Sequence, residues 1–298
     1  MDLSYGIFLA AYFISIVVAV VVGLLVVVRW KNIFVRKALL SFRYNAIYIV
    51  LILMFPVAVK VIELIQGRIS DPSSEFNEVI YTNWIFNLSG GAVRFLQDRL
   101  NNRLLTDVFI VVYVWLFVYI TVFPPTVLLA KDDRVVMRRY SIAMLLNGLI
   151  LLPFYALFPV SVTGSHPESG LTPLLYISPD WGRMVLGIDP LDNDFPSGHV
   201  SLSVTTFLVF AAAGFEYRKL AYFFGGSTVA IAFAVLYLGV HWPPDVYAGF
   251  LVGVVAFVLS GTEKLQMTID RWVRSASKRI FGDSVEEEFS SPPAGPGV

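Results

Sequence analysis

Long apolar stretches alternate with short polar segments along most of this chain. A membrane-spanning helix needs roughly 20 consecutive apolar residues. Seven stretches have or approach this length: 7–28, 46–65, 107–130, 141–160, 198–215, 220–239 and 246–262. The pattern therefore predicts an all-α fold, a polytopic transmembrane helix bundle of about seven spans.

The composition supports a membrane protein. Of the 298 residues, 57% are hydrophobic and only 15% are charged, whereas a soluble domain carries about 25% charged residues. The formal net charge is zero, so charge indicates no nucleic-acid partner. The chain has no cysteine, which excludes disulfides and thiolate chemistry.

Lysine and arginine residues indicate how the spans are oriented, because positively charged loops stay on the cytoplasmic side. Seven spans place four basic segments on one side: 29–43, 131–139, 218–219 and 264–279. The N-terminus and the three histidines, at 166, 199 and 241, then lie outside. The first apolar stretch lacks a basic leader and a small-residue cleavage site, so we expect it to be a retained span. We expect an integral protein of the plasma membrane whose active site faces the extracytoplasmic side.

Two outside segments are long enough to contribute to a site. Residues 67–106 mix apolar positions with Arg94, Arg99 and Arg103. This mixture is typical of an amphipathic helix on the lipid surface, or of a helix that supplies an arginine to a phosphate. Residues 161–196 form a long loop, and loops of this length are often functional. We expect this loop to form a lid or a wall of the site.

Four aspartates cluster in that loop and are its candidate metal ligands. Hard cations prefer oxygen ligands, but these four residues show no fixed ligand spacing: Asp180, Asp189, Asp192 and Asp194. We expect solvated turns at these positions, with no metal site and no cofactor.

The chain divides into four parts. Residues 1–66 are expected to form N-terminal transmembrane helices, and 67–106 the outside amphipathic segment. Residues 107–262 form the catalytic transmembrane core. A cytoplasmic tail, 263–298, begins as a basic amphipathic helix and ends in a Pro- and Gly-rich stretch typical of disorder.

The stretch FPSGH, at 195–199, begins the fifth predicted span. Ser197 is a good N-cap residue, and Gly198 lets the backbone approach a ligand. A helix start offers free N–H groups and the positive end of the helix dipole, so it favours an anion. His199 falls in the first turn, beside any anion held there. The alternative is a serine cap followed by an interfacial histidine without a function.

The stretch YLGVHWPPD, at 237–245, begins the last span. The turn lets the Asp245 carboxylate fold back toward His241. A carboxylate on one ring nitrogen sets the tautomer and leaves the other nitrogen free to attack. Such a pair is a nucleophile suited to phosphorus. Alternatively, Asp245 only caps the helix and His241 lies among the headgroups.

These two stretches resemble the second and third signature motifs of the type 2 phosphatidic acid phosphatase superfamily. The family pattern is KxxxxxxRP, then PSGH, then SRxxxxxHxxxD, and the likeness covers the C-terminal third of the chain. The resemblance implies a membrane enzyme in which His241 becomes a phosphohistidine. His199 would donate a proton to the leaving oxygen and then activate the acceptor, which is water or an alcohol.

Two features depart from the family pattern. Ala234-Val235 stand where the family has Ser-Arg, whose arginine binds phosphate. Residues 131–138 fit KxxxxxxR, but Arg139 replaces the proline and the segment is predicted to be cytoplasmic. Since charge that develops on phosphoryl oxygens needs cations, we expect them among other outside residues: Arg183, Arg94, Arg99 and Arg103.

The sequence therefore predicts a lipid phosphatase that hydrolyses a lipid phosphate or a polyprenyl pyrophosphate. A phosphotransferase remains an alternative, because Phe95-Leu96-Gln97 and residues 157–160 resemble the inositol phosphorylceramide synthase-like branch. The missing arginine leaves open a non-catalytic relative that binds lipid phosphate.

A transporter is the third alternative. Transporters place ionisable groups near mid-membrane, whereas Lys60 and Glu63 lie near the end of their span. The expected partners are the lipid phosphate or pyrophosphate and the surrounding membrane lipids. The oligomeric state is left open.

Overall fold

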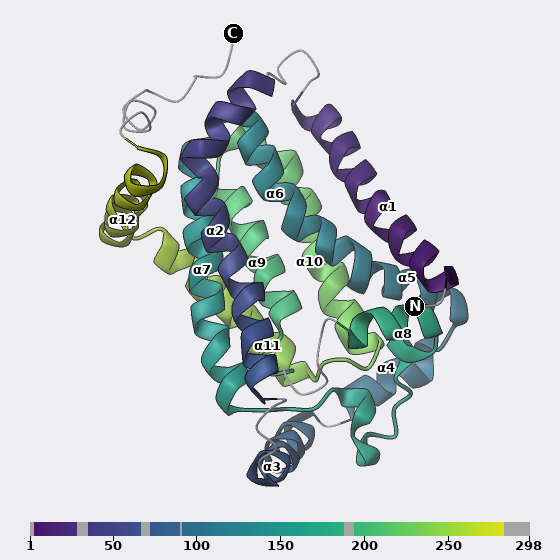
Figure 1. Ribbon diagram of the computed structural model, residues 1–298. Helices are drawn as coiled ribbons and strands as arrows, with labels where there is room; N and C mark the ends of the chain where they lie inside the picture. Colours follow the sequence, from purple (N-terminus) through teal and green to yellow (C-terminus); the bar gives the residue numbers. More distant parts are fainter. Residues whose placement is uncertain (1–2, 29–34, 67–71, 90, 188–193, 283–298) are drawn as a thin grey trace.

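The computed structural model describes the chain except for residues 1–2, 29–34, 67–71, 90, 188–193 and 283–298 (Figure 1). Over the described residues the fold is all-helical and contains no β-strand. The principal helices are α1 (Leu3–Val28), α2 (Val35–Gln66), α3 (Pro72–Ser89), α4 (Ala92–Leu100), α5 (Arg103–Val111), α6 (Phe117–Lys131), α7 (Arg134–Leu157), α8 (Pro179–Leu186), α9 (Gly198–Ala212), α10 (Arg218–Tyr237), α11 (Pro243–Ser260) and α12 (Glu263–Phe281). A π-helical turn, η2 (Val112–Leu116), joins α5 to α6 without a break.

Among the described residues, six helical segments are long and apolar enough to cross a membrane. They are Leu3–Val28, Asn45–Ile62, Arg103–Lys131, Arg134–Leu157, Phe215–Tyr237 and Pro243–Ser260. Helix α9, predicted as the fifth span, is apolar but only 15 residues long. The predicted all-α transmembrane architecture is confirmed.

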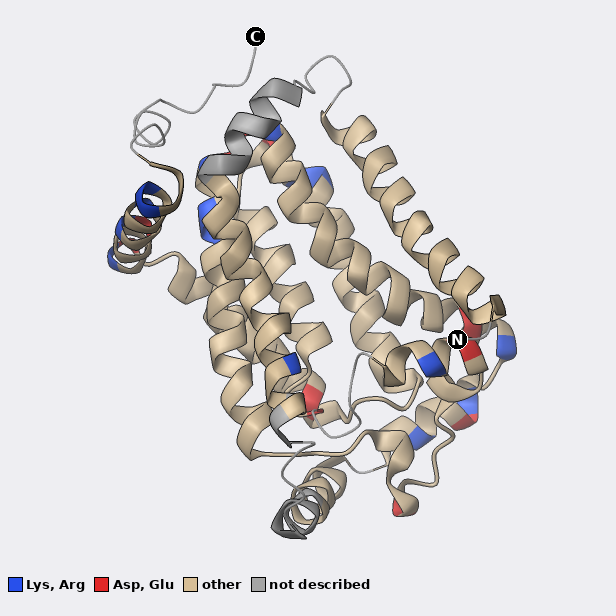
Figure 2. Cartoon of the chain, viewed as in Figure 1, with Lys and Arg blue, Asp and Glu red and all other residues tan. Residues whose placement is uncertain are grey.

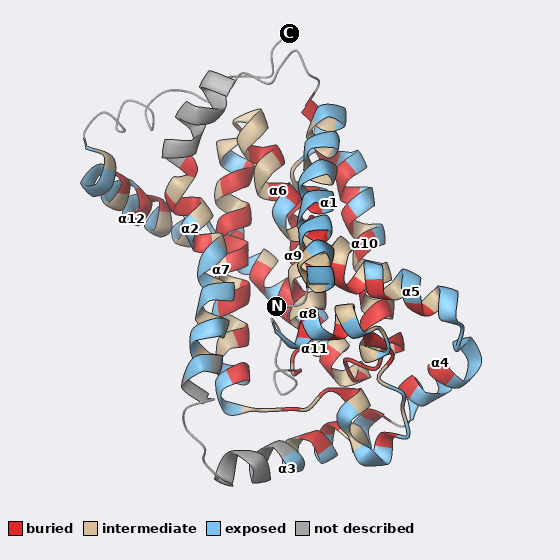
Figure 3. Ribbon diagram, turned by 45° about the vertical axis from the view of Figure 1, so that its right-hand side comes forward, coloured by how far each residue is buried: buried red, intermediate tan, exposed pale blue. Residues whose placement is uncertain are grey.

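Many large apolar residues are exposed on the bundle; Figure 3 marks the exposed positions in pale blue along its outer helices. On α1, for example, Phe13, Val17 and Val21 are all exposed. Exposed apolar surface of this extent is unusual in a soluble monomer. Lipid chains would cover it in a membrane.

Close packing of α9 against α11 determines the geometry of the core. A Cβ atom on Gly249 would lie 2.5 Å from the Ser197 carbonyl oxygen, and one on Gly253 would lie 2.7 Å from that of Ser201. Two glycines at this four-residue spacing let helix backbones approach closely in a membrane. The contact holds the start of α9 beside the start of α11.

A buried asparagine links α7 to α9. The side-chain amide of Asn147 donates a hydrogen bond to the Thr205 hydroxyl (2.7 Å), and its oxygen accepts one from the Ser201 hydroxyl (3.0 Å). All three side chains are fully buried. Polar bonds of this kind hold helices together where lipid offers no other partner.

The described basic segments from the α6–α7 turn onward lie at one end of the bundle. Lys131 forms an ion pair with Glu216 (3.2 Å), and the Tyr217 hydroxyl donates to Asp133 (2.8 Å). These bonds join the α6–α7 turn to the α9–α10 turn. Figure 2 shows charged residues concentrated toward the ends of the bundle, with few along its middle. The α12 helix joins the same end, since Asp270 lies 3.7 Å from Arg138.

Helices α3, α4 and α8 lie at the other end (Figure 1). There Gln97 of α4 is buried and donates to the carbonyl oxygens of Tyr237 (2.9 Å) and Thr172 (3.0 Å). The segment predicted as one amphipathic region thus forms α3, α4 and the start of α5. The 161–196 segment, expected to be a loop, contains α8 and several short 3₁₀ turns.

Candidate active site

The start of α9 is held by bonds from both sides. Ser197 is its N-cap, and the hydroxyl accepts from the backbone N–H of Val200 (3.4 Å). The Ser197 backbone N–H donates to the Asp245 carbonyl (3.0 Å). Gly198 packs closely against Tyr155, since a Cβ atom at position 198 would lie 2.7 Å from the Tyr155 hydroxyl and would displace it. The predicted cap at Ser197 is therefore present, whereas the approach of a ligand to Gly198 remains a prediction.

His199 lies between two aromatic rings of the long helix that runs from α5 to α6. The centroid of its imidazole ring lies 4.3 Å from the centroid of the Tyr113 ring and 4.1 Å from that of the Phe117 ring. Tyr113 belongs to the π-helical turn, and such turns occur frequently at functional sites. The two contacts restrict the orientation of the His199 ring.

The start of α11 places Asp245 against His241. One carboxylate oxygen, Oδ2, accepts the backbone N–H of Trp242 at 2.7 Å and lies 3.5 Å from Nδ1 of His241. His241 and Asp245 are 3% and 0% exposed. Asp245 thus caps the helix and also faces the imidazole, which the sequence left as alternatives.

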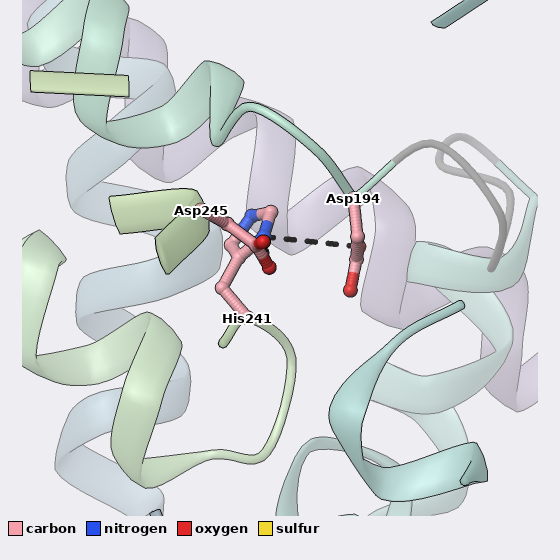
Figure 4. A group of neighbouring side chains, drawn as sticks. All are labelled: Asp194, His241 and Asp245. Atoms are coloured by element: carbon pink, nitrogen blue, oxygen red, sulfur yellow. Dashed lines mark ion pairs between the residues drawn. The ribbon is translucent and has the colours of Figure 1, made fainter. Parts of the chain in front are cut away.

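A second carboxylate faces the same ring nitrogen (Figure 4). Oδ1 of Asp194 lies 3.8 Å from Nδ1 of His241, and the Asp194 side chain is buried. Its backbone N–H donates to the Val160 carbonyl (3.2 Å), which anchors the residue. The expectation of a solvated turn is wrong for Asp194. The sequence could have indicated this, because Asp194 directly precedes FPSGH. If that motif packs against His241, Asp194 must also lie close to His241.

The other loop aspartates are not part of this cluster. Asp189 and Asp192 lie outside the described residues, and Asp180 is in the first turn of α8. Asp194, His241 and Asp245 each have one possible ligand atom, and these atoms lie within 4.8 Å of one another. Among the described residues, this group could hold a cation. The absence of a metal requirement remains a prediction.

The two motif histidines face one another across a short gap. Their ring centroids are 6.1 Å apart, with the rings inclined at 62°. Both line one cavity of about 650 Å³. Its walls come from α1, α2, η2, α6, α7, α8 and α9, so it extends from the histidines between apolar helices.

Comparison with known proteins relates part of this chain to a known family. Residues 141–262 match the PAP2 superfamily. That segment contains both histidines together with Asp194 and Asp245, and it confirms the resemblance seen in the sequence.

One curated relative supports the match. An undecaprenyl-diphosphatase from Sulfolobus acidocaldarius is 28% identical over 144 residues, which is 47% of this chain. The aligned part spans 59% of the length of that relative. No solved structure matches the chain with significance.

Buried apolar residues occupy the position where the PAP2 pattern has an arginine. Ala234 and Val235 are both fully buried in α10. The Val235 carbonyl accepts the backbone N–H groups of Val240 (3.1 Å) and His241 (3.0 Å). This pair therefore shapes the turn that carries His241. It presents no cation to the cavity.

The four arginines predicted to bind phosphate are all exposed, and none belongs to the described residues that line the cavity. Arg183 stacks on Tyr5 at 4.8 Å. The others are on α4 and at the start of α5: Arg94, Arg99 and Arg103. Among the described lining residues, the one lysine or arginine is Lys60 of α2.

Proposed function

We propose that this protein is an integral-membrane lipid phosphatase that acts through a phosphohistidine. The observation that carries the proposal is the pairing of His199 and His241 on one cavity between apolar helices. The PAP2 match and the diphosphatase relative support the same class of reaction.

His241 is the proposed nucleophile. Both carboxylates face its Nδ1, so a proton held on Nδ1 leaves the lone pair of Nε2 free for attack. As Nε2 bonds to phosphorus and the P–O bond to the lipid breaks, positive charge develops on the ring. The two carboxylates stabilise that charge.

His199 is the proposed acid and base. With its ring held 6.1 Å from that of His241, it is within reach of the leaving oxygen of a phosphoryl group bound between the two. It gives that oxygen a proton in the first step. In the second step it takes a proton from water, which attacks phosphorus, breaks the P–N bond and releases phosphate.

The cavity supports a lipid substrate. Tyr113 and Val122, which both line it, are separated by about 14 Å along one continuous helix. Its volume falls in the usual range for ligand sites, roughly 300–1,000 Å³. A hydrocarbon chain can occupy the part between the helices while the phosphate meets the histidines.

The active site is proposed to face the extracytoplasmic side. Tyr155, near the end of α7, donates to the Pro196 carbonyl (3.1 Å). Arg134, at the start of α7, lies about 32 Å away along the helix, in the basic end of the bundle. Since basic segments favour the cytoplasm, the histidines would face the outside of the plasma membrane.

A phosphotransferase remains the second candidate. Gln97, part of the stretch that resembles the inositol phosphorylceramide synthase-like branch, is buried and fixes the turn after α10. The two functions share the phosphohistidine and differ in the acceptor that attacks it.

The test supplies purified protein with a polyprenyl pyrophosphate and a short-chain phosphatidate, each with and without polyol or lipid-alcohol acceptors. Phosphate release without an acceptor supports the phosphatase. Product formation that requires an acceptor supports the transferase. No reaction with either lipid, from protein that is folded, would overturn both.

A further inference from the structure

A phosphoryl group at His241 meets two buried carboxylates there, Asp194 and Asp245. Their charges oppose an incoming anion unless a cation offsets them. The PAP2 pattern supplies an arginine for this purpose, and this chain has buried Val235 in its place. A compensating cation must therefore come from another element.

Helix α2 supplies a residue of the right kind. The residues of α2 that line the cavity follow one helical stripe: Ile52, Leu53, Phe55, Pro56, Val59 and Lys60. This spacing matches a single face of an α-helix. Lys60 therefore ends an otherwise apolar stripe.

The position of Lys60 along the axis of α2 is close to the level of the two motif histidines. Phe55 packs beside Tyr155, with ring centroids 6.3 Å apart, and the Tyr155 hydroxyl bonds the Pro196 carbonyl. The Phe55 ring thus lies on the side of the PSGH segment, although a Cβ atom on Gly148 of α7 would lie only 2.8 Å from the Phe55 Cβ. Lys60 lies about 7.5 Å further along α2. Since helical side chains lean toward the N-terminus of their helix, the lysine leans back toward that level.

The position of Lys60 in a membrane helix is a second reason to expect that it meets an anion. Lys60 lies within the candidate span Asn45–Ile62. A cationic residue in a membrane helix is costly unless it faces an aqueous cavity or an anion. The cavity that Lys60 lines holds the Asp194 carboxylate and the two histidines.

We propose that Lys60 binds the phosphoryl group of the substrate, in the role that arginines fill in the PAP2 pattern. The inference rests on the proposed function for the identity of the substrate. The ligand chemistry it requires is a phosphate anion, whether free or attached to a lipid.

The experiment measures the binding of inorganic phosphate and of orthovanadate to purified protein in detergent, by calorimetry, and hence without turnover. Lys60→Gln should weaken binding about 10- to 100-fold, the range for a lost charge-assisted hydrogen bond. Lys60→Arg should retain most of the affinity. Lys219→Gln, at the basic end of the bundle, is the matched control and should bind as the unaltered protein does.

Unchanged binding by Lys60→Gln would overturn the proposal, as would an unaltered protein that binds neither anion. If Lys60→Gln does not fold, Lys60→Met removes the charge and keeps most of the side-chain length. The same proteins are then assayed for lipid hydrolysis. If anion binding depends on Lys60 but no lipid is hydrolysed, only the proposed phosphatase function is refuted. If lipid is hydrolysed but anion binding does not depend on Lys60, only the proposed role of Lys60 is refuted.

Discussion

Asp194 and His241 form a buried pair, with 3.8 Å between Oδ1 and Nδ1, although helices α9 and α10 separate them in the chain. The pairing adds a second carboxylate to the His241–Asp245 arrangement. It also makes the residue before FPSGH part of the site.

Replacing Asp194 with asparagine should slow phosphoenzyme formation about 100-fold, because the shape is kept while one charge that stabilises the phosphorylated ring is lost. Rapid-quench measurement with a labelled lipid substrate checks this. Asp180→Asn, in the first turn of α8 and not in contact with the cavity, is the control. A normal rate of phosphorylation in Asp194→Asn would show that only Asp245 acts on His241.

The two histidines should fail in different ways. His241→Ala should abolish both turnover and the acid-labile phosphoenzyme. His199→Ala should slow turnover by roughly 10²–10⁴-fold, the usual contribution of a general acid, and least for substrates with good leaving groups. Phosphoenzyme trapping and a series of leaving groups check both. Normal phosphoenzyme in His241→Ala would end the nucleophile assignment.

The orientation in the membrane can be tested with single cysteines, since the chain has none of its own. Glu168 is exposed in the segment 161–196, which precedes FPSGH, and Lys219 is exposed at the basic end. Glu168→Cys should react with an impermeant thiol reagent on intact cells, and Lys219→Cys should react only after permeabilisation. The reverse pattern would place the histidines in the cytoplasm.

Packing of α9 against α11 should depend on Gly253. A Cβ atom there would lie 2.7 Å from the Ser201 carbonyl and 2.8 Å from the Val204 Cβ. Gly253→Ala should therefore cost about 1–3 kcal/mol of stability, measured as a lower Tm in detergent. Gly226→Ala in α10 meets no atom within 4 Å and should not lower the Tm. Equal stability of both variants would contradict the packing argument.

The four arginines predicted from the sequence to bind phosphate should not contribute to phosphate binding in the cavity. Changing Arg94, Arg99, Arg103 and Arg183 together to alanine should leave phosphate binding in detergent within about twofold, because none of the four lines the cavity. A higher KM on anionic vesicles, with kcat unchanged, would fit a role at the headgroups. Loss of phosphate binding would instead restore the original prediction and displace Lys60.

Much of this protein was determined by local features of the sequence. The length of the apolar stretches predicted the transmembrane helices, because a bilayer requires about 20 residues to cross. Ser197 caps its helix and Asp245 folds back toward His241, because both contacts span only a few residues. The distance between the two motifs, two apolar segments, predicted that they meet at one end.

The tertiary structure decided which side chains reach the cavity. Asp194 was expected in solvent but is buried, with its backbone N–H donating a hydrogen bond to the Val160 carbonyl. The arginines of the expected outside segments do not line the cavity, whereas Lys60 on an apolar helix does. Spacing along the chain gives the positions on a helix, but the rotation of that helix is set by its packing against neighbours. The identity of the cation in the site therefore depended on the bundle as a whole.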